Sequence, residues 1–206
     1  MNPTQAGITT TTHHLTDTLH TLHIPHTPRD TYHLHQLVSA ATKGTNRPLW
    51  ATPRKGTLVI RSPHLNETTL PPETAATTTT TPIPETDTHV EWALIANPTR
   101  TTPTPLQKNG TRPKRRRYPI PEEEVPEWVN RKLIGPLTDI TVTGIEKIPT
   151  SVGYRQKTRH RITHTRYALN GTATVTNQKK LADLLHAGVG PGKAFGCGLL
   201  ITKETP

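Results

Sequence analysis

The stretch that decides the fold lies near the C-terminal end and reads QKKLADLLHAGVGPGKAFGCGLLI over residues 178–201. Three leucines on one face of its first ten residues predict a helix over Gln178–Ala187. Five glycines follow within eleven positions, and a short apolar strand near Leu199–Ile201 comes next. Because glycine permits positive φ and a close approach of the backbone to another molecule, this loop is typical of a contact surface.

Two nucleotide-binding glycine motifs are excluded by the same residues. A phosphate-binding loop of the Walker type needs glycine where Ala187 stands and a hydroxyl side chain where Ala194 stands. A dinucleotide-binding fingerprint follows a strand and opens a helix, whereas here the helix precedes the glycines. A lysine among the glycines, Lys193, instead favours contact with a phosphate backbone. A helix cap followed by a tight turn remains the structural alternative.

Composition points to a polyanionic partner. The 206 residues include 25 Lys and Arg against 15 Asp and Glu, which gives a formal charge of +10 and favours nucleic acid over an acidic membrane. Only 31% of the residues are hydrophobic, so the cores must be small. The single cysteine, Cys197, excludes an intrachain disulfide framework and a cysteine-based zinc site. With no apolar stretch long enough to span a membrane and a polar N-terminus, we predict a cytoplasmic protein without a membrane partner.

Hydrophobic periodicity predicts two similar halves. Residues 8–12 have strand composition, and the polar, histidine-rich segment His13–Thr27 is interpreted as a connection. The remaining elements of the first half are a helix over Thr31–Lys43, short strands near Pro48–Thr52 and Thr57–Arg61, a short helix plus a mobile loop within 66–88, and a strand over His89–Asn97.

The second half has a similar set of elements. Its predicted elements are a helix over Glu122–Leu133, strands near Asp139–Thr143, His160–Ala168 and Gly171–Val175, the helix Gln178–Ala187 and the final strand. Asn170-Gly171 is interpreted as a hairpin turn between two of the strands. Each half is interpreted as roughly βαββαβ, which predicts an α+β protein of two tandem ferredoxin-like (RRM-like) domains, residues 1–97 and 98–206.

The first helix carries a candidate acid–base pair. Tyr32 and His35 are three residues apart, opposite the apolar stripe of the helix, so they are expected to face solvent or a ligand. Histidine titrates near pH 6.5 and can exchange a proton at neutral pH, whereas tyrosine stays protonated and can orient a phosphoryl oxygen. A solvated polar helix face is the alternative.

Basic residues form a second candidate site. Arg155, Lys157, Arg159 and Arg161 alternate before and into a strand, which predicts one face of a β-ribbon that contacts the phosphates of an RNA stem. The charged outer face of an edge strand is the alternative. The run Lys114–Arg117 is interpreted as a solvated linker. The spacing of His20, His23 and His26 could bind a metal adventitiously, and a histidine-rich metal-binding protein is an alternative function. Because metal sites need defined spacing and usually include carboxylate or thiolate ligands, we predict neither a metal nor another cofactor.

Together these features resemble one family, the CRISPR repeat-processing endoribonucleases, and most closely the CasE subunit of the type I-E Cascade complex. The string GVGPGKAFGCGLL at 188–200 looks like the glycine-rich signature of that family. Asp30–His35 resembles its Asp-x-Tyr-x-Leu-His helix start, and Ile95–Thr99 resembles its strand-ending Ala-Asn-Pro. Glu127–Lys132 resembles its Trp-Leu-x-Arg-Lys helix, and Tyr167–Thr176 the hairpin before its last helix.

The resemblance implies an activity and a partner. Family members cleave CRISPR precursor RNA without a metal, within the repeat at the base of its stem-loop, and leave a 2′,3′-cyclic phosphate and a 5′-hydroxyl. The product often stays bound, so the implied partners are the crRNA and other Cascade subunits. Tyr32 and His35 match the catalytic pair. A subunit that binds the RNA stem-loop without cutting it remains the alternative function.

The resemblance also assigns RNA-binding residues. Arg155, Lys157 and Arg159 fall in the basic segment that binds the RNA stem. The glycine loop, with Gly190 and Gly192, would support this platform and place Lys193 on a phosphate. The sequence departs from the family pattern at Gln36, where a basic residue often follows the catalytic histidine, and in its threonine-rich N-terminal segment.

Overall fold

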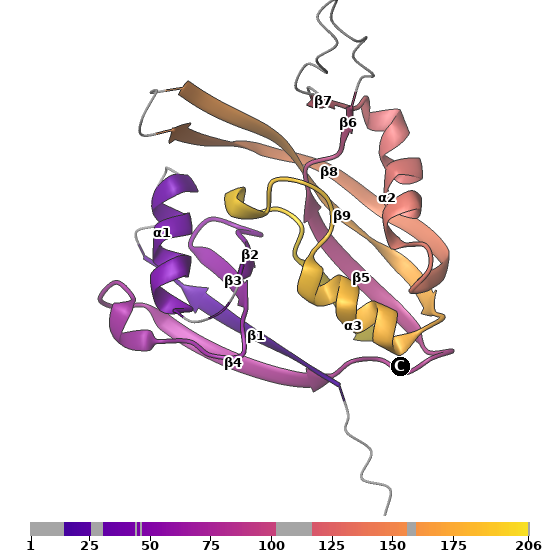
Figure 1. The fold of residues 1–206 in the computed structure, drawn as a ribbon, viewed down its shortest axis with the longest axis horizontal. Coiled ribbons are helices and arrows are strands. Elements are labelled where there is room, and N and C mark those ends of the chain that lie inside the picture. The colour runs from indigo at the N-terminus through magenta and orange to yellow at the C-terminus, as the bar shows by residue number, and fades with distance from the viewer. Residues whose placement is uncertain are drawn as a thin grey trace, which may run out of the picture.

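The protein folds around two four-stranded antiparallel sheets (Figure 1). The computed structural model describes residues 15–25, 31–43, 45, 47–101, 117–155 and 160–205, and the side chains of all of these except 151–155 and 160–162. Both sheets are part of α+β units, which confirms the predicted tandem ferredoxin-like architecture.

The first sheet has the strand order β2-β3-β1-β4 and carries helix α1. A single 3₁₀ turn, η1, occupies the place of a second helix, as the prediction of a short helix anticipated. The elements are β1 (Thr16–His23), α1 (Thr31–Ala41), β2 (Leu49–Ala51), β3 (Thr57–Arg61), η1 (Glu67–Thr69) and β4 (Ala75–Pro82).

The second sheet has the order β10-β5-β9-β8, and helices α2 and α3 belong to the same unit. Its strands β8 and β9 continue beyond the sheet as a long two-stranded ribbon (Figure 1). The elements are β5 (His89–Ala96), η2 (Glu122–Glu124), α2 (Val125–Leu133), β8 (Leu137–Arg155), β9 (His160–Val175), α3 (Gln178–Ala187), η3 (Lys193–Phe195) and β10 (Leu200–Glu204). The short strands β6 (Thr99–Thr101) and β7 (Arg117–Pro119) form a separate pair.

The position of the first strand differs from the prediction. Residues 8–12 lie outside the described part of the chain, and the strand next to β3 is Thr16–His23, within the segment interpreted as a connection. The polar residues Asp17 and His20 occupy buried positions in it. Asp17 pairs with Arg61, while the two ring nitrogens of His20 bond to Thr78 Oγ1 (2.8 Å) and the Ser62 carbonyl oxygen (3.0 Å). Because polar side chains occupy these buried positions, the strand lacks the alternation of apolar residues from which a strand is predicted. Their partners are distant in sequence, so no local pattern indicates the contacts.

The predicted boundary between residues 97 and 98 is also corrected. Residues 75–82, expected in a mobile loop, form strand β4, which pairs with β1 and closes the first sheet. Strand β5 therefore is not the last strand of the first unit; it pairs with β9 and β10 in the second sheet. The chain passes from one sheet to the other between Pro82 and His89. β4 escaped prediction because its side chains are mostly exposed threonines without an apolar face.

Asn170-Gly171 is not a turn. Both residues lie inside the continuous strand β9, opposite Gly144 and Val142 of β8. A Cβ at Gly171 would lie 1.8 Å from the Thr141 carbonyl oxygen and 2.7 Å from the Trp92 ring, so this glycine permits a close approach of two strands under the indole. The Trp92 indole Nε1 donates to the Thr172 carbonyl oxygen at 3.1 Å. The dipeptide thus serves packing within the sheet.

The two units share a buried interface. Leu49, Ala51 and Val59 of the first sheet pack in one cluster with residues of the second unit, namely Ile95, Cys197 and Leu199. Arg61 crosses the same interface: its guanidinium donates to both carboxylate oxygens of Asp17 at 2.6 and 2.7 Å. It also donates to the carbonyl oxygens of Leu185 (2.8 Å) and Leu200 (2.6 Å) in the second unit. The first of these is among the last carbonyls of α3, which lack partners within the helix.

The glycine loop is held between two tryptophans. Gly190 has φ +71°, and a Cβ there would lie 2.9 Å from the Trp128 ring of α2. Gly196 has φ +73°, and a Cβ there would lie 2.7 Å from the Trp50 ring of β2. Left-handed backbone and close contact with an aromatic ring are both required, which explains why glycine stands at these positions. The loop therefore joins the two units as a packing element.

This packing predicts a cost for one added methyl group. Gly196→Ala should destabilise the protein by about 1–2 kcal/mol through left-handed backbone and by a further ~1–3 kcal/mol through overpacking against Trp50. Gly56→Ala is the matched control, because Gly56 has φ +79° but the nearest atom to its Cβ lies 3.6 Å away. Urea unfolding would measure both. Equal losses in the two variants would contradict the proposed contact with Trp50.

Candidate functional site

Helix α1 carries the predicted pair Tyr32 and His35. Leu34, Val38 and Ala41 are buried against the first sheet, as the apolar stripe predicted. Tyr32 and His35 are half-buried, so they lie at the edge of the packed surface. The Tyr32 ring meets the ring of His33 edge-on, with centroids 6.2 Å apart.

The imidazole of His35 has two unequal nitrogens. Its Nδ1 is enclosed and has no hydrogen-bond partner among the described residues. The backbone carbonyl oxygen of His35 accepts a hydrogen bond from Ser39 Oγ at 2.8 Å. Enclosure of Nδ1 leaves Nε2 as the nitrogen that can exchange a proton with a bound molecule.

Two parts of the second unit approach α1. The helix contacts strand β8 and the 3₁₀ turn η3 of the glycine loop, and Figure 1 shows it beneath the ribbon with the loop beside it. The fold therefore brings three sequence-predicted features together: the Tyr32/His35 helix, the β8–β9 ribbon and the loop that carries Lys193. Tyr32 and His35 are more than a hundred residues away in the chain from both the ribbon and the loop.

Two residues of the basic segment, Arg155 and Arg161, lie on the two strands of the ribbon. Arg155 belongs to β8 and is opposite His160, while Arg161 belongs to β9 and is opposite Tyr154. Lys157 and Arg159 lie outside the described residues. Arg155 and Arg161 therefore lie on two paired strands, whereas the sequence predicted a single alternating run before and into one strand.

The predicted loop residues occupy one wall of a groove. Lys193 is half-buried, and burial together with the nearby charge of Arg47 lowers its pKa. Gly192 has φ +85° and approaches Asn97 and Cys197, while Gly190 lies against Trp128. The groove also contains Phe195 of the glycine loop and His164, which the sequence did not reveal as a functional candidate. Their ring centroids lie 4.4 Å apart although the residues belong to different elements.

Cys197 is excluded as a nucleophile. It is fully buried between the two units, and burial raises the pKa of its thiol to about 12 although the charge of Arg166 lowers it. The Arg166 guanidinium is engaged in hydrogen bonds within the protein. It donates to the Pro149 carbonyl oxygen (2.9 and 3.0 Å) and to Thr52 Oγ1 (3.3 Å). Both residues therefore connect the units, and neither presents a reactive group.

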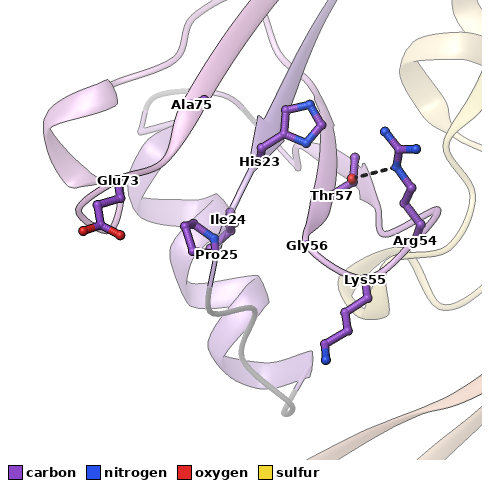
Figure 2. Close-up of a pocket in the computed structure, with 9 residues that line it drawn as sticks. All are labelled: His23, Ile24, Pro25, Arg54, Lys55, Gly56, Thr57, Glu73 and Ala75. Atoms are coloured by element: carbon purple, nitrogen blue, oxygen red, sulfur yellow. Dashed lines mark hydrogen bonds between the residues drawn. The ribbon is translucent and has the colours of Figure 1, made fainter.

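A separate cavity of about 510 Å³ lies at one end of the first sheet (Figure 2). Arg54 and Lys55 lie on one side of it and Glu73 on the other, with His23 between them. Arg54 Nε is engaged by Thr57 Oγ1 at 3.2 Å. The lining has mixed charge, and none of the predicted site residues belongs to it.

Two further features were sought within the described ranges. No group of three or more His, Cys, Asp or Glu residues there is arranged to hold a metal ion. No helix in the same part of the chain is long and apolar enough to cross a membrane.

Comparison with known proteins places the chain in a family. A family model described as CRISPR associated protein matches residues 13–203. The chain belongs to this family. The comparison with curated proteins found no match. The family match covers both sheets and reaches the last strand, so the membership concerns the whole of the described fold.

Solved structures of similar fold agree with the membership. The crystal structure of the CRISPR-associated protein Cas6e from Escherichia coli K-12 is 27% identical, has a TM-score of 0.63, and covers 91% of this chain and 100% of its own. A CRISPR endoribonuclease Cse3 bound to a 19-nucleotide RNA is 19% identical, with a TM-score of 0.68 and 91% and 98% coverage. A chain of a CRISPR RNA-guided surveillance complex is 16% identical, with a TM-score of 0.64 and 91% and 100% coverage. The predicted resemblance of this CRISPR-associated protein to CasE-type proteins is confirmed.

Proposed function

We propose that this CRISPR-associated protein is an endoribonuclease that cleaves CRISPR precursor RNA within the repeat, at the base of its stem-loop. Family membership and the fold shared with a CRISPR endoribonuclease bound to RNA support the substrate class. The observation that carries the proposal is the position of helix α1. This helix holds Tyr32 and His35 and contacts both β8 and the glycine loop. After cleavage the protein stays on the crRNA as a Cascade subunit, a role supported by the similar chain in a surveillance complex.

The proposed reaction is a transesterification that needs no metal. The ribose 2′-oxygen attacks the adjacent phosphorus in line, and the bond from phosphorus to the 5′-oxygen breaks. The 2′-hydroxyl loses its proton and the departing 5′-oxygen gains one, so the products are a 2′,3′-cyclic phosphate and a 5′-hydroxyl. His35 exchanges a proton with one of these two oxygens through Nε2, because Nδ1 is enclosed. Tyr32 hydrogen-bonds the 2′-hydroxyl or the scissile phosphate and orients it.

The ribose hydroxyl provides the test. Repeat hairpin RNA with a 2′-deoxy sugar at the scissile position should resist cleavage, while the all-ribose hairpin should be cut in the presence of EDTA. Product ends are identified by mass spectrometry, which distinguishes a cyclic phosphate from a linear one. Cleavage of the deoxy substrate, or a requirement for Mg²⁺, would overturn the mechanism.

A further inference from the structure

Two cavities beside the glycine loop form one continuous groove. Their volumes are about 400 and 560 Å³, and they share five lining residues from the β6–β7 pair and the glycine loop. We call the combined space the glycine-loop groove. The shared residues are Thr99, Arg117, Pro191, Gly192 and Lys193.

One end of the groove is cationic. Arg117 of β7, Lys132 of α2 and Lys193 of the loop line it, and the described lining residues of both cavities include no carboxylate. Thr99 and Thr101 of β6 line the same space. Three cations without a counter-charge favour a polyanion, because each cation that neutralises a phosphate releases a condensed counterion.

The other end is aromatic and polar. Phe195 and His164 line it, with their rings inclined by 51°. Asn97, only 4% exposed, donates through Nδ2 to His164 Nδ1 at 2.7 Å. This leaves the proton of the neutral imidazole on Nε2, which is buried and has no partner among the described residues. Burial lowers the pKa of His164, which favours that neutral form.

The groove adjoins the candidate catalytic helix. The turn η3, Lys193–Phe195, lines the groove on one side and contacts α1 on the other. An RNA strand at Tyr32 and His35 therefore needs only to pass over η3 to enter the groove. Stacking on an aromatic ring requires an unpaired base, and phosphate contacts along a narrow groove fit one strand.

We propose that the glycine-loop groove binds the single-stranded RNA that continues beyond the base of the repeat stem. Its phosphates lie along Arg117, Lys132 and Lys193, and one unpaired base stacks on Phe195. This inference rests on the proposed function and adds a second RNA-binding surface, separate from the β8–β9 ribbon. The strand on either side of the stem has the required chemistry, so the experiment distinguishes the 5′ from the 3′ extension.

Binding measurements on non-cleavable hairpins test the groove. The probes carry a 2′-deoxy scissile sugar followed by one nucleotide, so that the scissile phosphate is present, and are used without further extension or with a short 5′ or a longer 3′ single strand. One extension should tighten binding to the wild-type protein. Lys132→Ala, at an exposed position, should reduce that gain and lower the salt slope of the extended probe by about 0.7. Phe195→Leu should reduce the gain about tenfold. Lys180→Ala, an exposed lysine of α3, is the matched control and should change neither.

The outcomes separate this inference from the function on which it rests. If neither extension tightens binding while the wild-type protein still cuts the short all-ribose hairpin, the groove proposal is wrong and the nuclease stands. If Lys132→Ala weakens the short and extended probes equally, the groove binds the stem and the proposal is also overturned. Failure to bind or cut any hairpin overturns both. Should Phe195→Leu not fold, Lys132→Ala and Arg117→Ala decide the question.

Discussion

His35→Ala should abolish most of the RNA cleavage while leaving hairpin binding intact. A positioned general acid or base contributes about 10²–10⁴-fold to a rate, so the single-turnover cleavage rate should fall by that factor. Binding should persist, because the ribbon and the glycine loop lie on other elements than α1. Rates under single-turnover conditions and a dissociation constant for the 2′-deoxy hairpin measure the two effects separately.

A second histidine supplies the control for this experiment. His64→Ala removes an exposed imidazole from the segment after β3 and should leave the cleavage rate unchanged. The melting temperatures of both variants show whether the half-buried His35 side chain matters to the fold. If the wild type and His35→Ala bind the hairpin equally and neither cuts it, the protein is the non-catalytic stem-loop binding subunit instead.

Arg61→Met should be among the most destabilising substitutions in the described part of the chain. The Arg61 side chain is 4% exposed and that of Asp17 9% exposed, so the variant leaves a buried carboxylate without its partner. Removing one member of a buried ion pair costs about 3–5 kcal/mol. The variant also frees the carbonyl oxygens of Leu185 and Leu200, which join the second unit to the first. Urea unfolding monitored by tryptophan fluorescence measures the loss.

Two further variants isolate the cause. The double variant Asp17→Leu/Arg61→Met should be more stable than Arg61→Met alone, since it removes the unpaired charge although the two carbonyl oxygens remain unsatisfied. Arg131→Met is the matched surface control: its ion pair with Glu127 is 61% and 73% exposed and should contribute at most about 0.5 kcal/mol. A double variant less stable than the single one would show that Asp17 does not depend on Arg61.

Elements with strong local periodicity were predicted well. The helix Gln178–Ala187 and the strand Thr57–Arg61 have the bounds that the sequence predicted. Helix α1 begins at Thr31 as predicted and ends at Ala41, within the expected range. These segments bury an apolar face against their own unit, so the pattern of their side chains reports their structure directly.

Elements whose partners are distant in sequence were missed. β1 carries Asp17 and His20 inward, and β4 is a row of exposed threonines. Both strands are specified by pairing with each other and by polar contacts to Arg61, Ser62 and Thr78. No local sequence pattern indicates such contacts. Because β4 was missed as the strand that closes the first sheet, β5 was assigned to that sheet instead of the second.

By itself, the sequence determined the fold class, the family resemblance and the identity of the candidate pair Tyr32 and His35, because these depend on motifs and periodicity within short segments. Only the tertiary structure decided why glycine stands in the loop and which elements lie beside Tyr32 and His35. Two glycines of the loop, Gly190 and Gly196, are packed against Trp128 and Trp50, because a Cβ at either position would collide with the ring. The same packing sets η3 against α1 and opens the groove beside it, an arrangement of residues that are distant along the chain.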